Sequence, residues 1–116
     1  GAFENQALRP IAPEVLLNPA KRSEVEAKLK AFVTKGNVAV INQSFEGLLT
    51  HIEKSNPDGK IDPAMMKEFE AVSTLIPDDS FTACFASKGN VPFWTKQVLE
   101  GKFSQTLLKR LRTKKV

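Results

Sequence analysis

The sequence predicts an all-α single domain of about six short helices, arranged as a compact superhelix of the α-solenoid kind. Apolar residues recur at intervals of three and four along most of the chain, and proline or glycine separates these periodic segments. No stretch combines sustained alternation of apolar and polar residues with an excess of β-branched residues, which argues against a sheet. The chain has 116 residues, of which 41% are hydrophobic, enough for one modest core.

Residues 1–17 contain Pro10 and Pro13 but show no apolar period. We therefore expect a flexible linker or a tag-derived N-terminus, although its apolar residues can still lie against the domain. The helical domain is expected to cover residues 18–113. Residues 114–116 are expected to form a frayed basic C-terminus.

Two start signals are present for the first helix, namely Asn18-Pro19 and the Ser23-x-x-Glu26 capping box, and Gly36 is its stop. A second helix runs from Asn37 to the turn at 56–59. Its apolar spacing is the most regular in the chain, so we expect this helix at the centre of the core. The apolar faces of the two helices are Val25, Leu29, Phe32 and Val33 in the first, and Val38, Ile41, Phe45, Leu48, Leu49 and Ile52 in the second.

Four further helices follow. Asp62-Pro63 begins the third, which carries Met65, Phe69, Val72 and Ile76 and ends by Pro77. A short fourth helix starts within 78–80 and closes at Gly89, and a fifth runs from Asn90-Val91-Pro92 to Gly101. The last helix ends near Thr113, and its apolar residues Phe103, Leu107, Leu108 and Leu111 fall within one arc.

The net charge of +4 is concentrated at one end of the chain. Residues 102–116 contain no acid, whereas residues 1–101 carry 11 basic and 13 acidic residues. Such a cluster is typical of contacts with the phosphate backbone of DNA, which are independent of base sequence, and less often of an anionic membrane. Basic residues at a helix end also complement the helix dipole and aid solubility, and a basic tail can be a nuclear localisation signal. The candidate DNA-binding residues are Lys102, Lys109, Arg110, Arg112, Lys114 and Lys115.

Residues suited to catalysis are scarce. His51 is the only histidine and Cys84 the only cysteine, and neither belongs to a nucleophile motif, a zinc ligand set, a phosphate-binding loop or a dinucleotide fingerprint. We therefore expect a non-enzymatic module without metal or cofactor. A single cysteine fits a reducing compartment, and the basic tail favours the nucleus. No apolar run approaches the roughly 20 residues of a membrane span, so no membrane partner is expected.

Phe93-Trp94 is the densest aromatic spot. Adjacent helical residues face different directions, so one ring is expected in the core and the other at its edge. Core packing of both rings is the favoured interpretation, and the functional alternative is a partly exposed Trp94. An exposed tryptophan would be a binding anchor. A protein-interaction groove near Phe93, Trp94 and Phe103 is therefore the second functional hypothesis, with the basic tail then serving only localisation.

The chain resembles the C-terminal helical domain of the larger Ku subunit, the DNA-end-binding protein of non-homologous end joining. The resemblance covers residues 18–111. It is carried by Asn18-Pro19-Ala20, by the helix of residues 42–53 ending in His51-Ile52-Glu53, and by Phe93-Trp94 followed by Val98, Leu99 and Gly101.

This resemblance implies a superhelical all-α docking module for double-strand-break repair, tethered by a linker to the DNA-encircling core. Implied partners are DNA, other repair proteins and, through the rest of a full-length chain, the smaller Ku subunit. Vertebrate members continue into an acidic and hydrophobic peptide that recruits the catalytic subunit of the DNA-dependent protein kinase. Here Arg112-Thr113-Lys114-Lys115-Val116 stands instead, which fits a lineage that works without that kinase.

Overall fold

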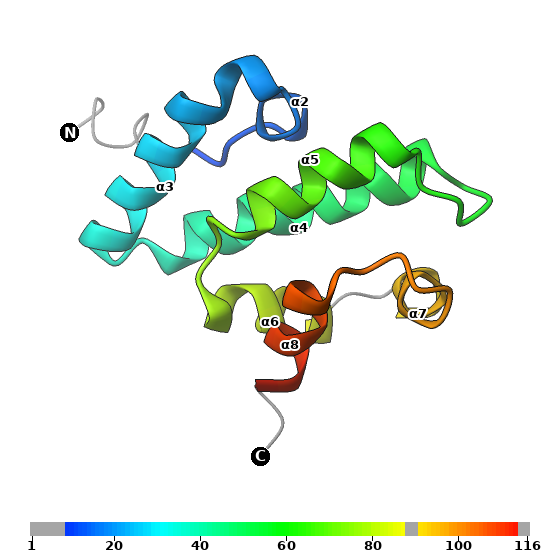
Figure 1. Ribbon diagram of the computed structural model, residues 1–116. Helices are drawn as coiled ribbons and strands as arrows, with labels where there is room; N and C mark the ends of the chain where they lie inside the picture. Colours follow the sequence, from blue (N-terminus) through cyan, green and yellow to red (C-terminus); the bar gives the residue numbers. More distant parts are fainter. Residues whose placement is uncertain (1–8, 88–90, 114–116) are drawn as a thin grey trace.

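Seven α-helices and one 3-10 helix are present in the computed structural model, which describes residues 9–87 and 91–113 (Figure 1). No strand occurs in these ranges, so the all-α single-domain fold is confirmed. The elements are α2 (Pro13–Leu16), η1 (Pro19–Lys21), α3 (Arg22–Lys35), α4 (Val38–Ser55), α5 (Pro63–Ser73), α6 (Asp78–Ser87), α7 (Val91–Leu99) and α8 (Gln105–Thr113).

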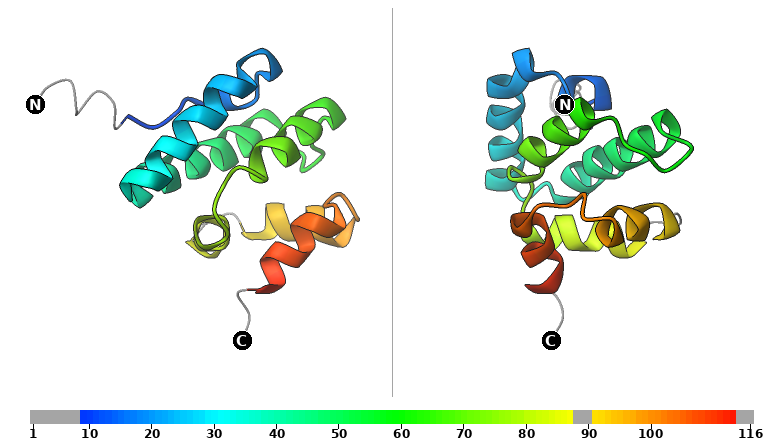
Figure 2. Two further views of the ribbon diagram at one scale, coloured as in Figure 1. Left: turned by 60° about the vertical axis from the view of Figure 1, so that its left-hand side comes forward. Right: turned by 45° about the vertical axis from the view of Figure 1, so that its right-hand side comes forward.

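The helices lie in three successive tiers. α2 and α3 form one tier, α4 and α5 form the middle tier, and α6, α7 and α8 form the third, as the views in Figures 1 and 2 agree. α4 contacts α2, α3 and α6, so it links the first tier to the third. Its six buried side chains include Phe45, Leu48 and Leu49, each 0% exposed, which confirms that this helix is central to the core.

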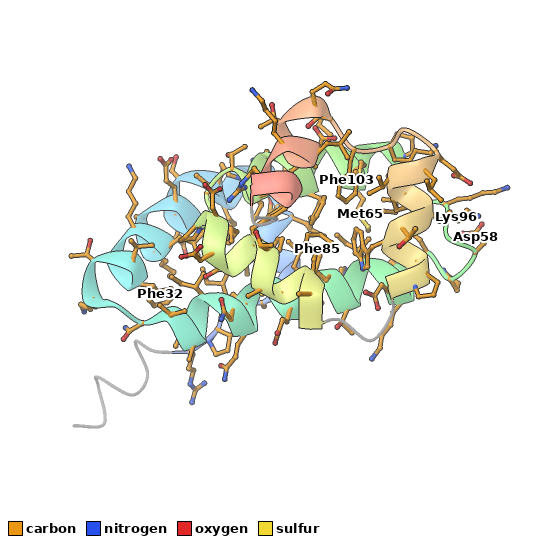
Figure 3. The ribbon with its side chains drawn as sticks, turned by 90° about the horizontal axis from the view of Figure 1, so that it is seen from below. Phe32, Asp58, Met65, Phe85, Lys96 and Phe103 are labelled. Atoms are coloured by element: carbon orange, nitrogen blue, oxygen red, sulfur yellow. The ribbon has the colours of Figure 1, made fainter. Side chains whose placement is uncertain are left out.

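A continuous aromatic cluster joins the middle and third tiers. Phe45 of α4 stacks on Phe69 of α5 at a centroid distance of 6.1 Å, and Phe81 of α6 lies 5.5 Å from Phe45. Phe85 and Phe103 extend the cluster from α6 and from the loop before α8, with 6.1 Å between their ring centroids. Figure 3 shows both side chains, together with Met65, pointing into the same interior region.

Local signals set several of the helix ends. The Asp62 carboxylate accepts hydrogen bonds from the backbone N–H groups of Ala64 and Met65, at 3.1 and 3.2 Å, and so caps α5. Gly36 ends α3 with φ 73°, a left-handed conformation that glycine adopts without strain. Asn18 caps η1 through a 3.0 Å bond from Ala20 N, whereas Ser23 lies inside α3 and forms no capping box.

The N-terminal boundary of the domain lies earlier than expected. The prediction of a linker through residue 17 is wrong for residues 11–17, because Ile11 and Leu16 are 6% and 0% exposed and belong to the core. The backbone N–H of Ile11 also donates to the buried Ser44 Oγ of α4 at 2.9 Å. α2 is thus a part of the folded domain, and the first eight residues lie outside the described part of the chain.

Candidate nucleic-acid interface and a basic groove

The basic end of the chain is partly solvent-facing. Lys102, in the loop between α7 and α8, and Lys109, on α8, are both exposed. α8 holds them there because Leu107, on its inner side, is 1% exposed and Leu108 packs against the edge of the core. The side chain of Arg112, and both Lys114 and Lys115, lie outside the described residues.

Arg110 is not a free phosphate contact, and its assignment as one is corrected here. Its side chain is 13% exposed and its Nε donates to Asp78 Oδ1 at 2.8 Å. The two terminal nitrogens donate to the backbone carbonyls of Ser73 and Ile76, and the guanidinium carbon lies 4.4 Å from the centre of the Phe81 ring. Arg110 therefore ties α8 to the junction between α5 and α6, and its charge is offset by Asp78.

The aromatic residues proposed as partner anchors lie in the core. Phe93, Trp94 and Phe103 are 8%, 4% and 5% exposed, so the reading in which both Phe93 and Trp94 pack inside is confirmed and the partly exposed Trp94 is wrong. The two rings contact each other edge to face at a centroid distance of 5.0 Å, and Phe69 and Phe85 enclose Trp94 at 5.5 and 5.3 Å. The Trp94 indole Nε1 donates to Glu53 Oε2 of α4 at 2.5 Å, which satisfies its polar atom without solvent.

The two reactive side chains have structural surroundings. Cys84 is 1% exposed and its thiol donates to the Asn42 carbonyl at 3.6 Å. Burial, with a smaller contribution from the nearby Glu46 carboxylate, raises the pKa of Cys84 to about 12, so the thiol stays protonated at neutral pH and is a poor nucleophile. His51 is half-buried near the end of α4.

The described residues contain neither a metal-ligand cluster nor a membrane-spanning helix. The side chains of His, Cys, Asp and Glu described here form no group of three or more that could hold a metal ion. Across residues 9–87 and 91–113, every helix is too short or too polar to cross a bilayer.

A basic groove in the first tier was not predicted from the sequence. It has a volume of about 480 Å³ and runs between the segment of residues 9–15 and one face of α3. Lys21, Lys28 and Lys35 follow its α3 side, and Arg9 lies on the opposite wall. The seven-residue spacing of the three lysines places them along one helix face, a signal that was available in the sequence.

Comparison with known proteins gives no assignment: no family model matches the chain, and neither the curated proteins nor the solved structures include a significant match.

Proposed function

We propose that this chain is a non-catalytic interaction module of a Ku-type end-joining complex, and that it contacts the DNA backbone through its C-terminal end. The observation that carries the DNA contact is the distribution of charge, because residues 102–116 hold six basic residues and no acid. Phosphate contacts of this kind are independent of base sequence and weaken steeply with salt.

Fewer than six of the predicted DNA-binding side chains are supported by their exposure in the fold. Lys102 and Lys109 are exposed, so both ammonium groups can reach a phosphate without rearrangement of the domain. Arg112, Lys114 and Lys115 remain in the proposal on their charge alone. Arg110 is left out, because its guanidinium is already bonded to Asp78 and to two backbone carbonyls.

The Ku proposal rests on the sequence resemblance, and two of the motifs that carry it are in contact in the fold. The motif ending in Glu53 and the Phe93-Trp94 motif, both of which carry the resemblance, are 41 residues apart in the chain yet meet through the Trp94–Glu53 hydrogen bond. The two motifs therefore form one structural unit. The proposal also places the chain in the nucleus. Its proposed partners are DNA, other repair proteins and the smaller Ku subunit.

The DNA contact is tested by titrating a labelled duplex of about 20 base pairs at several salt concentrations, since the salt slope counts the phosphates neutralised. The test variant replaces Lys109, Arg112, Lys114 and Lys115 by Gln and keeps Arg110. We expect weaker binding and a slope of log K against log salt that is smaller by about four.

The matched control replaces Lys28, Lys30, Lys54 and Lys60 by Gln, which removes the same net charge from other surfaces. We expect it to retain most of the affinity of the unaltered chain. Equal losses in the two variants, or no binding at low salt by the unaltered chain, would show that the terminus is not a DNA contact. The alternative would then hold, namely a helical protein-interaction domain whose basic tail serves localisation.

A further inference from the structure

The basic groove of the first tier has fixed walls. One wall is the segment of residues 9–15, which is held against α4 by the 2.9 Å bond from Ile11 N to Ser44 Oγ. Ser44 is itself 1% exposed and donates to the Val40 carbonyl at 2.9 Å. The other wall is the face of α3 that carries Lys28 and Lys35, with Lys21 at the end of η1 directly before that helix. A groove whose walls are held by buried contacts is available to a partner without refolding.

The rim of the groove is cationic and largely without counter-charges. Its ionisable side chains are Arg9, Lys21, Lys28, Lys35 and one acid, Glu24, which gives a net charge of +3. Glu24 pairs with Lys28 at 3.6 Å. Among the described residues, no carboxylate lies within ion-pair distance of the other three cations.

The floor of the groove is apolar. Pro10, Ile11, Ala12 and Val15 contribute to it from one wall, and Ala31 with the edge of Phe32 contributes from α3. An occupant must therefore supply aliphatic groups for the floor and negative charges for the rim. The 14 residues of α3 cover about 21 Å of helix axis at 1.5 Å per residue, which matches a bound helical segment of about 14 residues.

We propose that this groove binds an acidic, amphipathic peptide segment of a partner protein, with its aliphatic side chains on the floor and its carboxylates beside Arg9, Lys21, Lys28 and Lys35. Grooves that take an amphipathic helix along its apolar face are a common mode of protein recognition, and complementary charge at the rim adds specificity. A nucleic acid fits less well. A phosphate backbone has no aliphatic groups for the floor, and single-stranded bases require an exposed aromatic platform, whereas Phe32 is 6% exposed.

This inference goes beyond the proposed DNA contact, because it concerns another partner class and another surface. The groove is lined by the segment of residues 9–15, η1 and α3, whereas Lys102 and Lys109 lie in the loop before α8 and on α8, so the two surfaces share no residue. Variants of the groove therefore leave the C-terminal cations unchanged, and the two proposals can fail independently.

The test variant is the double substitution Lys28→Glu and Lys35→Glu. The chain offers a closely matched control in Lys30→Glu with Lys54→Glu. Lys28 and Lys30 each pair with a glutamate four residues earlier, at 3.6 and 3.3 Å, and Lys35 and Lys54 each occupy the last turn of a helix. The two double variants thus change the net charge equally and disturb similar local contacts, but only the first alters the groove.

The probe is a displayed library of random peptides of about 14 residues, the length that spans the groove. We expect selection on the unaltered chain to enrich peptides with glutamate or aspartate between aliphatic residues spaced three and four apart. In anisotropy titrations of an enriched peptide, the groove variant should bind at least about tenfold more weakly, while the control double binds within about twofold of the unaltered chain. Replacing the aliphatic residues of the peptide by serine should also abolish binding.

Circular dichroism and thermal unfolding establish that both doubles remain folded. The proposal is overturned if no acidic peptide is enriched, if both doubles lose affinity equally, or if the serine peptide binds as well as its parent. It is also overturned if duplex DNA, used as the second probe, binds the unaltered chain and is lost from the groove variant alone, since the groove would then be a phosphate-binding surface.

Discussion

Polar side chains at element junctions fix how the helices meet. Arg110 donates to the carbonyl of Ser73, the last residue of α5, and to that of Ile76, in the turn between α5 and α6. Asn56 is buried in the α4–α5 turn, where its amide donates to the Ile52 carbonyl at 2.8 Å and accepts from Asp62 N at 3.2 Å. The orientation of neighbouring helices therefore depends on a few hydrogen-bonding groups besides apolar packing.

We predict that Arg110→Ala destabilises the domain by about 2–4 kcal/mol, because it removes the side-chain donors to the Ser73 and Ile76 carbonyls, the ion pair with Asp78 and the contact over the Phe81 ring. Urea unfolding measures this change. The exposed neighbour Lys109→Ala is the control and should shift the free energy of unfolding by less than about 0.5 kcal/mol. Similar values for the two variants would show that Arg110 has no structural role.

The role of Arg110 was not predictable from residue spacing. Helical periodicity places it on the flank of the apolar arc, as expected, but its acceptors lie 32 to 37 residues earlier in the chain. The same holds for Trp94, whose hydrogen-bond acceptor Glu53 is 41 residues away. Local pattern cannot indicate whether a polar atom at the core edge finds water or a distant partner, so residue-level site predictions were the least accurate.

Helix boundaries were more predictable, because they depend on adjacent residues. Asp62-Pro63 begins α5, and Gly36 ends α3, as their local conformational preferences require. α2 was missed since its four residues are too few to show a period, and its stability comes from burial of Leu16. The basic groove was missed for a related reason: α3 supplies only one of its walls.

At the level of single elements, two glycines should respond oppositely to alanine. Gly36 has φ 73°, so Gly36→Ala should destabilise the domain by about 1 kcal/mol through backbone strain. Gly47 lies inside α4 with helical geometry, so Gly47→Ala should stabilise it by about 0.5–1 kcal/mol. An added methyl group meets no atom within 4 Å at either site, which excludes steric clash as the cause. Thermal unfolding of both variants measures the difference, and a shift of the same sign in both would contradict this account.

At the scale of the molecule, two basic surfaces are held on different tiers. The groove along α3 lies in the first tier, and the exposed Lys109 lies on α8 of the third. Under the two proposals, DNA and an acidic peptide bind without competing for the same cations. A domain of this kind can therefore hold a partner protein beside a DNA strand.

Residues 9–17 should be required for the stability of the whole domain. A chain beginning at Asn18 lacks the buried Ile11 and Leu16, which together contribute about 3–6 kcal/mol by area burial. This is a large share of the free energy of unfolding of a small domain, which is typically about 5–15 kcal/mol. Urea unfolding of chains beginning at Arg9 and at Asn18 compares the two, and equal midpoints would restore the linker interpretation.

The aromatic cluster has a consequence for synthesis on the ribosome, where the N-terminal part of a chain emerges first. Phe69 and Phe85 acquire their contacts with Phe103 only after residue 103 has been synthesised, and the Arg110 guanidinium over Phe81 arrives later still. Until then the rings of α5 and α6 are incompletely covered and open to chaperones. The nascent domain therefore reaches its final packing late, close to the release of residue 110 from the exit tunnel.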